Sequence, residues 1–565
     1  MRESGGGAES SLATSPLTLT LTLTLPMTLP SSLWSRCILV LLVLCVGAGA
    51  QSKLKLDKPQ KIKDWGYSIR TLEGWDSIAI KPEERFVVGH WKLNTDEMRK
   101  RGLYEEYQAG SYCDLSIIRI STVTVTGKQK TEEELKKEKE LKEKLKISPE
   151  LEKLLDPKTF DDLLQAMHKD CDKRWIRKPF KAGKIEGELI EFGADAEAHT
   201  IAYFKKNGVE WAAWYQAFEE ANRKTYRDWY IKSLETFDLF EPVNSDVIAM
   251  ARKDPNKLKG EEKREALKAS IAGTPGWYAI DAKHYVFLTN SSNKAFLQQI
   301  AKDLEVVREK VYMKMFPPRN EEEPISPVRV LDTESDYYKY GGPQGSAGYF
   351  NPRSGELVLF TKFEDVTKSN SMAYCRSVMF HEAFHQYIHF AVGDVSPHSW
   401  FNEGHGDYFA GMTVKGGVIK FEPFDWRVGF LKDHIRDKKD LIPLRSLIRF
   451  PQREYYTNAG LKYSQGWALI YYLRQVCKDD KAKASLDIYF KYVADNIESF
   501  RAKKKEEGDN DTGGESVPGI PGIMIPDFED AEKVKEILSK AVDTAFAGID
   551  LEGLDKDFRA WVEKL

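Results

Sequence analysis

Short apolar stretches separated by turn residues dominate the first half of the chain. Segments 67–69, 77–80, 86–88 and 115–120 alternate apolar with polar residues or run apolar, and both patterns predict β-strands. Strands resume near Ile185 and Thr200, and segment 226–240 predicts a helix followed by a closing strand. We therefore expect a mainly antiparallel, sheet-rich α+β domain over residues 51–243.

Two polar segments interrupt this first part or follow it. Segment 131–154 consists mostly of Glu, Lys and Leu, which is typical of a solvated helix or a partly ordered insertion. Segment 244–275 is rich in Lys and poor in apolar residues. We interpret it as a linker between two domains.

The second half changes from strands to helices. Segments 285–288, 328–331 and 356–360 predict strands, 293–315 predicts a helix, and helical periodicity dominates after Asn370. The Gly-rich segment 503–525 predicts a flexible insertion, after which 526–565 holds two amphipathic segments, 534–546 and 554–565. The expected class is α+β, with a second domain over 276–502 that combines a small sheet with helices and is completed by 526–565.

The amino-terminal fifty residues have the pattern of a targeting segment. An apolar run over 37–46 follows Arg36 and precedes small residues that end at Ala50, as in a signal peptide. We expect cleavage before Gln51, with an uncleaved anchor as the alternative, and a start at Met27 would leave a signal of ordinary length. The mature chain is then expected without a membrane span, either secreted or in a periplasmic or other extracytoplasmic compartment.

Net charge bears on the possible partners of the chain, and cysteine content bears on its disulfides. Lys and Arg number 84 and Asp and Glu 87, a net charge of -3, so nothing indicates nucleic-acid binding. The mature chain keeps four widely spaced cysteines, which do not form a metal-binding pattern: Cys113, Cys171, Cys375 and Cys477. One or two disulfides and buried free thiols both remain open.

The strongest chemical signal is His381-Glu382-Ala383-Phe384-His385, inside a helical pattern that begins after the candidate cap Ser371 and stops at Gly393. Residues four apart on a helix differ by only roughly 40° in direction, so His381 and His385 project from one face and can bind one metal ion. Glu382 lies beside them, where it can act as a general base.

A second helical segment supplies a third ligand. Glu403 follows a short loop and brings a carboxylate within reach of the two histidines. Three protein ligands with one open position are typical of a catalytic zinc site. Asp407, one turn beyond Glu403, can accept the remaining ring N–H of a ligand histidine. We expect one Zn²⁺ per chain, although other divalent ions can occupy such a ligand set.

The two motifs together resemble the gluzincin metallopeptidases, the clan of thermolysin-like enzymes and zinc aminopeptidases. Segment 463–469, Tyr-Ser-Gln-Gly-Trp-Ala-Leu, is similar to the Tyr-x-Lys-Gly segment of zinc aminopeptidases. That resemblance implies that Tyr463 stabilises the oxyanion. Gln465 replaces the lysine, and the Gly-x-Met-Glu-Asn segment that holds a free amino terminus is missing. Aminopeptidase specificity is therefore not implied.

Residues 278–565 also resemble the secreted bacterial proteins of the peptidase MA-like group, which share an HExxHQ helix, a Trp-x-x-Glu-Gly helix and a helical tail. The resemblance implies a thermolysin-like catalytic domain and a peptide or protein substrate. It further implies that segments 346–350 and 356–360 form a sheet edge to which an extended peptide could add as a strand. The amino-terminal domain carries no motif that we can assign.

Other histidines and tyrosines in this region have simpler interpretations. His389 is not expected to be a ligand, because three residues from successive turns of one straight helix do not surround a tetrahedral ion. His398 and His405 are expected at the surface or in the cleft, and Tyr455 and Tyr456 as core or catalytic residues. A metzincin site is excluded, since positions 388 and 391 hold Ile and Ala.

Three classes of function are compatible with the sequence. The first is a secreted zinc metallohydrolase, a peptidase in which Glu382 takes the proton of the attacking water. The second is a catalytically idle, zinc-holding extracellular binding module. The third is a structural extracellular protein whose motif residues form a hydrogen-bonded core. An intact Glu382 favours the first class over the second.

Overall fold

The computed structural model describes most of the chain after Leu54, and all of the described residues belong to one compact unit, Lys55–Leu565. The described residues are 55–81, 84, 86–94, 113–121, 158–167, 175–194, 197–218, 220–243, 245–251, 253–319, 324–363, 367–437, 440–506, 515–516, 524–525 and 528–565. The predicted signal peptide, the 131–154 segment and most of the predicted 503–525 insertion lie outside them.

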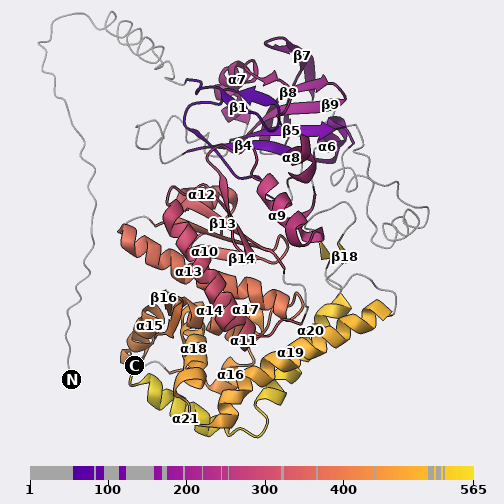
Figure 1. Cartoon of the computed structure of the whole chain (residues 1–565). Helices are drawn as coiled ribbons and strands as arrows, with labels where there is room; N and C mark the ends of the chain where they lie inside the picture. Colours follow the sequence, from indigo (N-terminus) through magenta and orange to yellow (C-terminus); the bar gives the residue numbers. More distant parts are fainter. Residues whose placement is uncertain are drawn as a thin grey trace, which may run out of the picture. The chain divides into compact units, whose positions relative to one another are not determined.

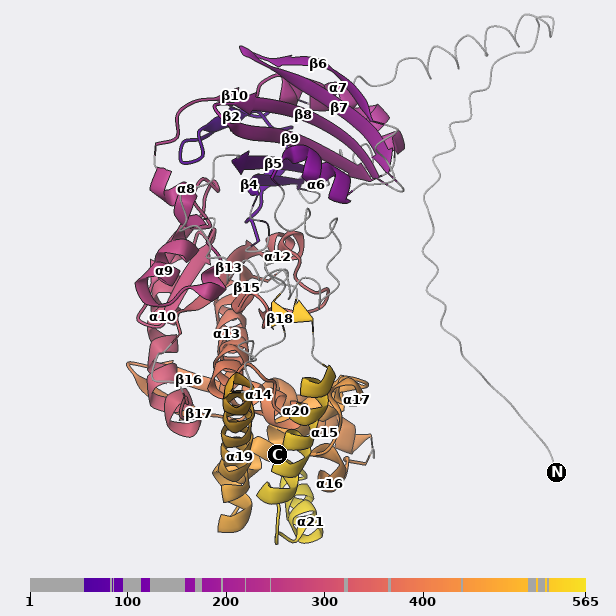
Figure 2. The same cartoon turned by 90° about the vertical axis from the view of Figure 1, so that its right-hand side faces the viewer.

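The amino-terminal part contains a seven-stranded antiparallel sheet, as the apolar alternation predicts. Its strand order is β3-β4-β5-β9-β8-β7-β6. The strands are β3 (Trp75–Ser77), β4 (Val87–Leu93), β5 (Asp114–Ser121), β6 (Ile176–Ala182), β7 (Ile185–Ala194), β8 (Glu197–Lys206) and β9 (Val209–Phe218). Asn207 and Gly208 join the last two with positive φ angles of 51° and 72°, as a two-residue hairpin turn requires. The long strands β6 to β9 curve together in Figure 2.

Two helices cover opposite faces of this sheet. α6 (Phe160–Met167) packs with Trp214, whereas α7 (Glu220–Leu234) packs with Tyr215. Trp214 and Tyr215 are neighbours in β9, and neighbouring strand residues point to opposite faces of a sheet. The two helices therefore cover opposite faces. A small antiparallel sheet of β1 (Gln60–Ile62), β2 (Tyr67–Ile69) and β10 (Asp238–Leu239) completes the part.

The predicted linker contains helices. Segment 244–275 includes α8 (Ser245–Ala251), the 3₁₀ turn η3 (Pro255–Lys257) and α9 (Gly260–Ala269). Leu267 and Ile271 are buried against Val286 and Leu288 of the next sheet. The few apolar residues of this segment are therefore enough to pack it on the sheet, although its Lys-rich composition alone predicted a linker.

The second sheet is mixed, with strand order β11-β12-β13-β15-β14. Its strands are β11 (Tyr278–Asp281), β12 (Tyr285–Thr289), β13 (Ser326–Thr333), β14 (Gly348–Asn351) and β15 (Glu356–Lys362). The three central strands are parallel, and both edge strands are antiparallel. Central strands of this kind are buried on both faces. One face packs on α9 and α12 (Glu334–Tyr340), and the other packs on α10 (Lys294–Val307) and α13 (Lys368–Ala391).

Helices make up most of the remainder, as the periodicity after Asn370 predicts (Figure 1). They are the π-helical turn η4 (Arg308–Tyr312), α11 (Met313–Met315), α14 (Ser399–Ala410), α15 (Asp425–Arg436), α16 (Leu444–Leu447), α17 (Gln452–Tyr455), α18 (Ala459–Tyr471), η5 (Tyr472–Val476), α19 (Asp480–Glu506), α20 (Phe528–Ala545) and α21 (Leu551–Val562). Two short hairpins are formed by β16 (Met412–Lys415) with β17 (Val418–Phe421) and by β18 (Glu515–Ser516) with β19 (Met524–Ile525). The fold class is α+β, with antiparallel and mixed sheets and many helices.

The described residues test part of what the sequence predicts about disulfides and membrane-spanning helices. Cys375 and Cys477 are buried free thiols, so the cysteines do not form two disulfides. Cys171 lies outside the described residues, so a pairing of Cys113 with Cys171 is not tested. No helix in the described part of the chain has the length and apolar character needed to cross a bilayer.

Candidate metal centre

α13 carries the first two candidate ligands, and specific contacts fix its start and hold it on the mixed sheet. Ser371 was the wrong cap: the helix begins four residues earlier, where the Thr367 side chain accepts from the Asn370 backbone N–H at 3.3 Å. Ser371 Oγ instead accepts from the Phe363 N–H. The buried Gln386 amide donates to two carbonyls, that of Pro327 in β13 (2.9 Å) and that of Gly355 in the turn before β15 (2.7 Å). The helix is thereby held against the sheet next to the site.

α14 carries the third candidate ligand and approaches its neighbours closely at two glycines. A Cβ at Gly404 would lie 2.7 Å from the carbonyl oxygen of Gly466 in α18, and one at Gly406 would lie 2.8 Å from Cε1 of His381. Neither position has space for a side chain. The two glycines therefore set the distance of α14 from α18 on one side and from the His381 imidazole on the other.

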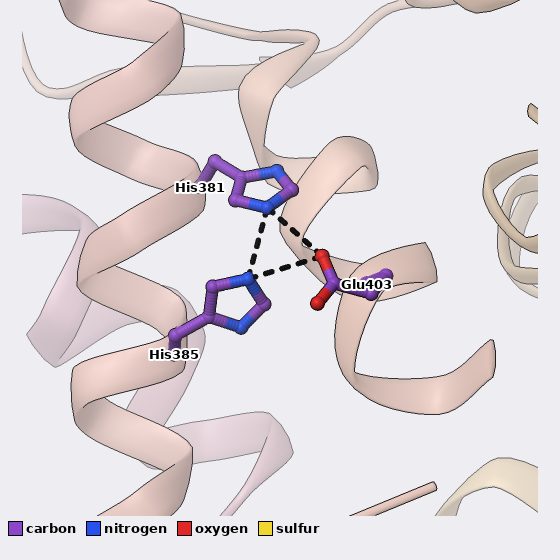
Figure 3. Close-up of side chains that lie close together, drawn as sticks. All are labelled: His381, His385 and Glu403. Carbon is purple, nitrogen blue, oxygen red and sulfur yellow. Dashed lines mark hydrogen bonds and ion pairs between the residues drawn. The ribbon is translucent and has the colours of Figure 1, made fainter. Parts of the chain in front are cut away.

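His381, His385 and Glu403 meet as the motif spacing predicts. Figure 3 shows the two imidazoles projecting from successive turns of α13 toward the carboxylate on α14. The Nε2 atoms of His381 and His385 are 2.9 Å apart and lie 3.2 and 3.3 Å, respectively, from Glu403 Oε2. The three side chains are 14%, 11% and 7% exposed, so they are reachable yet largely shielded from bulk water.

Each of these side chains is held by a further polar group. Asp407 Oδ1 lies 3.1 Å from His381 Nδ1, the contact expected from the sequence, and Asn402 Oδ1 lies 2.9 Å from His385 Nδ1. In the neutral imidazoles both contacts favour the ring proton on Nδ1, so each Nε2, which faces Glu403, could donate a lone pair once a metal ion replaced its proton.

Two residues extend this supporting network. The Arg427 guanidinium donates to Asp407 through Nε at 2.6 Å and through its second nitrogen at 3.3 Å. Tyr456 Oη donates to Glu403 Oε1 at 2.6 Å. The carboxylate oxygen that does not face the histidines therefore already has its hydrogen bond.

The electrostatics of the cluster favour positive charge. Burial alone would lower the pKa of His381, but hydrogen bonds to Asp407 and Glu403 outweigh it and hold this pKa well above its ordinary value. Burial alone would raise the pKa of Glu403, yet the two neighbouring imidazoles hold it well below the usual range. A cation that displaced the protons would meet the same negative groups.

The residues present fit a zinc ion. A tetrahedral zinc ion with bonds of about 2.0–2.1 Å keeps its donor atoms roughly 3.3 Å apart, close to the 2.9, 3.2 and 3.3 Å separations found here. Two neutral imidazoles and one carboxylate are also the donor types of catalytic zinc sites. Small adjustments of side-chain torsions would suffice to equalise the three separations.

Glu382 lies beside the cluster rather than in it. Burial raises its pKa against the lowering effect of His381 and His385. A Cβ at Gly348 would lie 3.3 Å from Glu382 Cγ, so β14 passes close to the carboxyl. A carboxyl with a raised pKa next to a metal site suits a group that takes up and releases a proton.

Tyr463 lines the same cavity of about 300 Å³ as the three candidate ligands and Glu382. Among the described residues its hydroxyl has no hydrogen-bond partner, and the Arg427 guanidinium lies 4.9 Å from the centre of its ring. Burial, and then the charge of Glu403, raise the pKa of Tyr463. The phenol therefore stays protonated and can donate to a ligand in the cavity.

One of the three other histidines of this region, His405, differs from the sequence-based expectation. His405 was expected at the surface or in the cleft, but it is fully buried among aromatic rings, and Arg474 Nε donates to its Nε2 at 3.1 Å. His398 is half-buried, with Nδ1 2.9 Å from Tyr489 Oη, and is not among the cavity-lining residues described. His389 lines the cavity without joining the ligand cluster.

The structure adds three residues that the sequence did not single out as part of the site. Asn402 directly precedes Glu403, so its place in the second motif was an available signal. Tyr456 was considered only as a core or catalytic residue, and its contact with Glu403 depends on how α17 packs on α14. Arg427 had no local signal, because its role depends on the docking of α15.

A second group of metal-ligand side chains is less suited to an ion. His284, Glu305 and Glu309 lie close together. Glu305 already accepts from the His284 backbone N–H at 2.7 Å and contacts its ring at 2.6 Å, and Glu309 accepts from Lys283 at 2.7 Å. These carboxylates are engaged by other partners.

Comparisons with known proteins do not place the chain in a family. No protein family and no curated protein matches it. Among solved structures, it is similar to cyanobacterial PsbP (CyanoP) from Synechocystis sp. PCC 6803, with 11% identity over 33% of this chain and 92% of that chain. The TM-score of 0.19 is too low to carry an argument about fold or function.

Proposed function

We propose that this chain is an exported zinc metallohydrolase that cleaves peptide bonds. The observation that carries the proposal is the convergence of His381 Nε2, His385 Nε2 and Glu403 Oε2 within 3.3 Å of one another at the wall of a cavity that also holds Glu382. Three ligands and an adjacent carboxyl are the parts that zinc-dependent hydrolysis requires.

The similarity of both motifs to the gluzincins supports the peptidase assignment, and we propose a thermolysin-like catalytic domain on that basis. A helix with HExxH that packs on a mixed sheet, followed by a second helix with the glutamate ligand, agrees with this proposal. The expected resemblance to the peptidase MA-like group also accounts for the helical tail, α19 to α21.

The proposed mechanism divides the chemistry among three metal ligands, a general base and an oxyanion donor. His381, His385 and Glu403 would hold the ion, which when bound would acidify water and polarise the scissile carbonyl. Glu382 would take a proton from the attacking water and deliver it to the leaving amine. The protonated Tyr463 hydroxyl would donate a hydrogen bond to the developing oxyanion.

The cavity wall suggests how a peptide would bind. β14 is one of the two edge strands of the mixed sheet, and Gly348, Tyr349 and Phe350 line the cavity beside Glu382. An extended peptide could pair with this edge as an added strand, which would carry its backbone past the ligand cluster. Main-chain pairing would fix the direction of the peptide, and side chains would fill the cavity.

The decisive test is metal content together with hydrolysis, measured on residues 51–565 and on a His385→Ala variant. We expect about one zinc per chain by elemental mass spectrometry in the unmodified protein and loss of zinc in the variant. Hydrolysis of a quenched peptide library should be lost with the metal and restored by adding zinc to the chelated unmodified protein. An unmodified protein without stoichiometric metal would refute the proposal.

A further inference from the structure

A second cavity, of about 630 Å³, lies away from the candidate metal centre. It is bounded by the start of α9, by η4 and the residues after α11, and by the carboxyl-terminal end of α13. None of its lining residues also lines the 300 Å³ cavity around His381. The two cavities are thus separate sites on the two sides of the last turns of α13.

Basic side chains dominate the described lining of this cavity: Lys259, Lys263, Arg308, Arg319 and Arg501 stand against one carboxylate, that of Asp394. Arg501 pairs with Asp394 at 3.1 Å. Arg319 pairs with Asp495, which is not among the lining residues described. Lys263 and Arg308 have no ion pair among the described residues, so the positive charge of these two side chains remains available to a ligand in the cavity.

Lys263 is one of two buried cations in this lining. Its side chain is only 7% exposed, and among the described residues it has neither a hydrogen bond nor an ion pair. Burial lowers its pKa to about 8, although Asp254 and Asp394 act in the opposite direction. A buried ammonium without a partner is costly, and a ligand that paired with it would remove that cost.

Arg308 is the second buried cation in the lining. It is 3% exposed, its contact with Ser326 Oγ is long at 3.4 Å, and its Nε has no hydrogen-bond partner in the described structure. Its guanidinium lies over the rings of Tyr285 and Tyr387 at 5.3 and 5.4 Å. It belongs to the π-helical turn η4, a departure from regular helix that is frequent at functional sites.

The start of α9 adds backbone donors to the same wall. Gly260, its first residue, lines the cavity, and the capping residue Lys259 provides no side-chain cap to the helix. The two acidic residues of the first turn are engaged elsewhere, Glu261 with Arg264 and Glu262 with Lys253. The N–H groups at the start of this ten-residue helix, which have no side-chain cap, therefore favour a negative charge.

We infer that this cavity binds a small organic oxyanion, a phosphate ester or a carboxylate. Its charged group would pair with Lys263 and Arg308 near the start of α9, where a lysine acts as a point charge and an arginine can bind two oxygens at once. Its apolar part would contact Met313 and Phe390, which also line the cavity. The inference does not depend on the proposed peptidase activity.

Calorimetric titration of residues 51–565 with phenyl phosphate and with benzoate tests this site, with benzyl alcohol as the uncharged control. We expect at least one oxyanion to bind and the alcohol not to bind. Lys263→Met should weaken binding by at least about tenfold, because a charge-assisted hydrogen bond is lost. Lys257→Met, which removes an exposed lysine of the same segment outside the described lining, should leave the affinity unchanged.

The outcomes separate the ligand classes and the two sites. Tighter binding of phenyl phosphate would identify the phosphate class, and tighter binding of benzoate the carboxylate class. Binding that persists in the His385→Ala variant would show that the site is independent of the metal centre. Equal affinity in Lys263→Met and the unmodified protein, or no binding of either oxyanion to a folded chain, would overturn the inference.

Discussion

Tyr456 Oη donates a 2.6 Å hydrogen bond to Glu403 Oε1, while Glu403 Oε2 faces His381 and His385. The phenol thus occupies one carboxylate oxygen and leaves the other for the metal. Tyr463 lies beside it in the cavity, with ring centres 6.1 Å apart, but its hydroxyl has no partner in the described structure. Two neighbouring tyrosines therefore have different expected roles, one toward the ligand and one toward the substrate.

Tyr456→Phe and Tyr463→Phe should separate these roles. Loss of the Tyr456 hydrogen bond should weaken zinc affinity by about 10- to 100-fold, as for other groups that orient metal ligands. Loss of the Tyr463 hydroxyl should leave zinc affinity unchanged and lower kcat by about 10²- to 10³-fold, as for an oxyanion donor. Zinc competition with a chelator and steady-state kinetics measure the two effects. The reverse pattern would exchange the two assignments.

Gly406→Ala tests whether a residue without any ligand atom controls the metal site. The added Cβ would lie 2.8–3.0 Å from three atoms of the His381 ring, so the imidazole must move away from Glu403. We expect a clear loss of zinc affinity, measured by chelator competition. Gly429→Ala is the matched control, because its Cβ meets no atom within 4 Å and a glycine-to-alanine change inside a helix is stabilising by roughly 0.5–1 kcal/mol. Unchanged zinc binding in Gly406→Ala would contradict this account.

The candidate site was predictable where its signal is local. The i, i+4 spacing of His381 and His385, and the one-turn spacing from Glu403 to Asp407, are properties of single helices, and the structure brings these residues together as their spacing indicates. The central parts of β2 and β5 were predictable for the same reason, since apolar alternation within a few residues defines a strand.

The remaining features depend on packing between elements. His405 was misplaced because a polar residue in a motif reads as exposed, whereas its burial depends on aromatic rings from α13, α14 and the residue after α11. The start of α13 was misplaced because Thr367 and Ser371 are equivalent caps in sequence, and the Phe363 N–H engages the second one. Arg427 reaches Asp407 because α15 packs on α18, and no local sequence pattern predicts that packing.

Glu382→Gln should separate metal binding from catalysis. The amide keeps the shape of the side chain but cannot take a proton, so we expect kcat to fall by about 10²- to 10⁴-fold, the usual contribution of a general base. Zinc content should remain at the level of the unmodified protein, because Glu382 is not in the ligand cluster. The control is His385→Ala, which should lose both. Undiminished hydrolysis by Glu382→Gln would remove Glu382 from the mechanism.

Arg427→Met tests the ion pair behind His381. Asp407 is 3% exposed, and its pairing with Arg427 is bidentate, so the variant leaves a buried carboxylate with one partner fewer. We expect the free energy of unfolding to fall by on the order of 3 kcal/mol, as when one partner of a buried pair is removed. Urea unfolding measures this change. Arg436→Met is the control: its pair with Asp433 is 73% and 64% exposed, and exposed pairs contribute little. Equal losses in both variants would show that the Asp407 pair has no special role.

Lys263 should make stability depend on pH in an identifiable window. Burial lowers its folded pKa from 10.5 to about 8, so between these two pH values the unfolded chain binds more protons than the folded one. The contribution of Lys263 to the free energy of unfolding therefore rises as pH increases through this window. The shift corresponds to at most about 3.5 kcal/mol at roughly 1.4 kcal/mol per pKa unit.

The difference in unfolding free energy between the unmodified chain and Lys263→Met isolates this contribution, since all other titrating groups cancel to first order. From about pH 7 to about pH 10 we expect the difference to move in favour of the unmodified chain, because its lysine becomes neutral in the folded state. An oxyanion bound at saturation should flatten the trend, since its charge keeps the ammonium protonated. A difference that is constant across this range without any oxyanion would mean that Lys263 is solvated in the folded chain, and that the cavity does not hold an uncompensated charge.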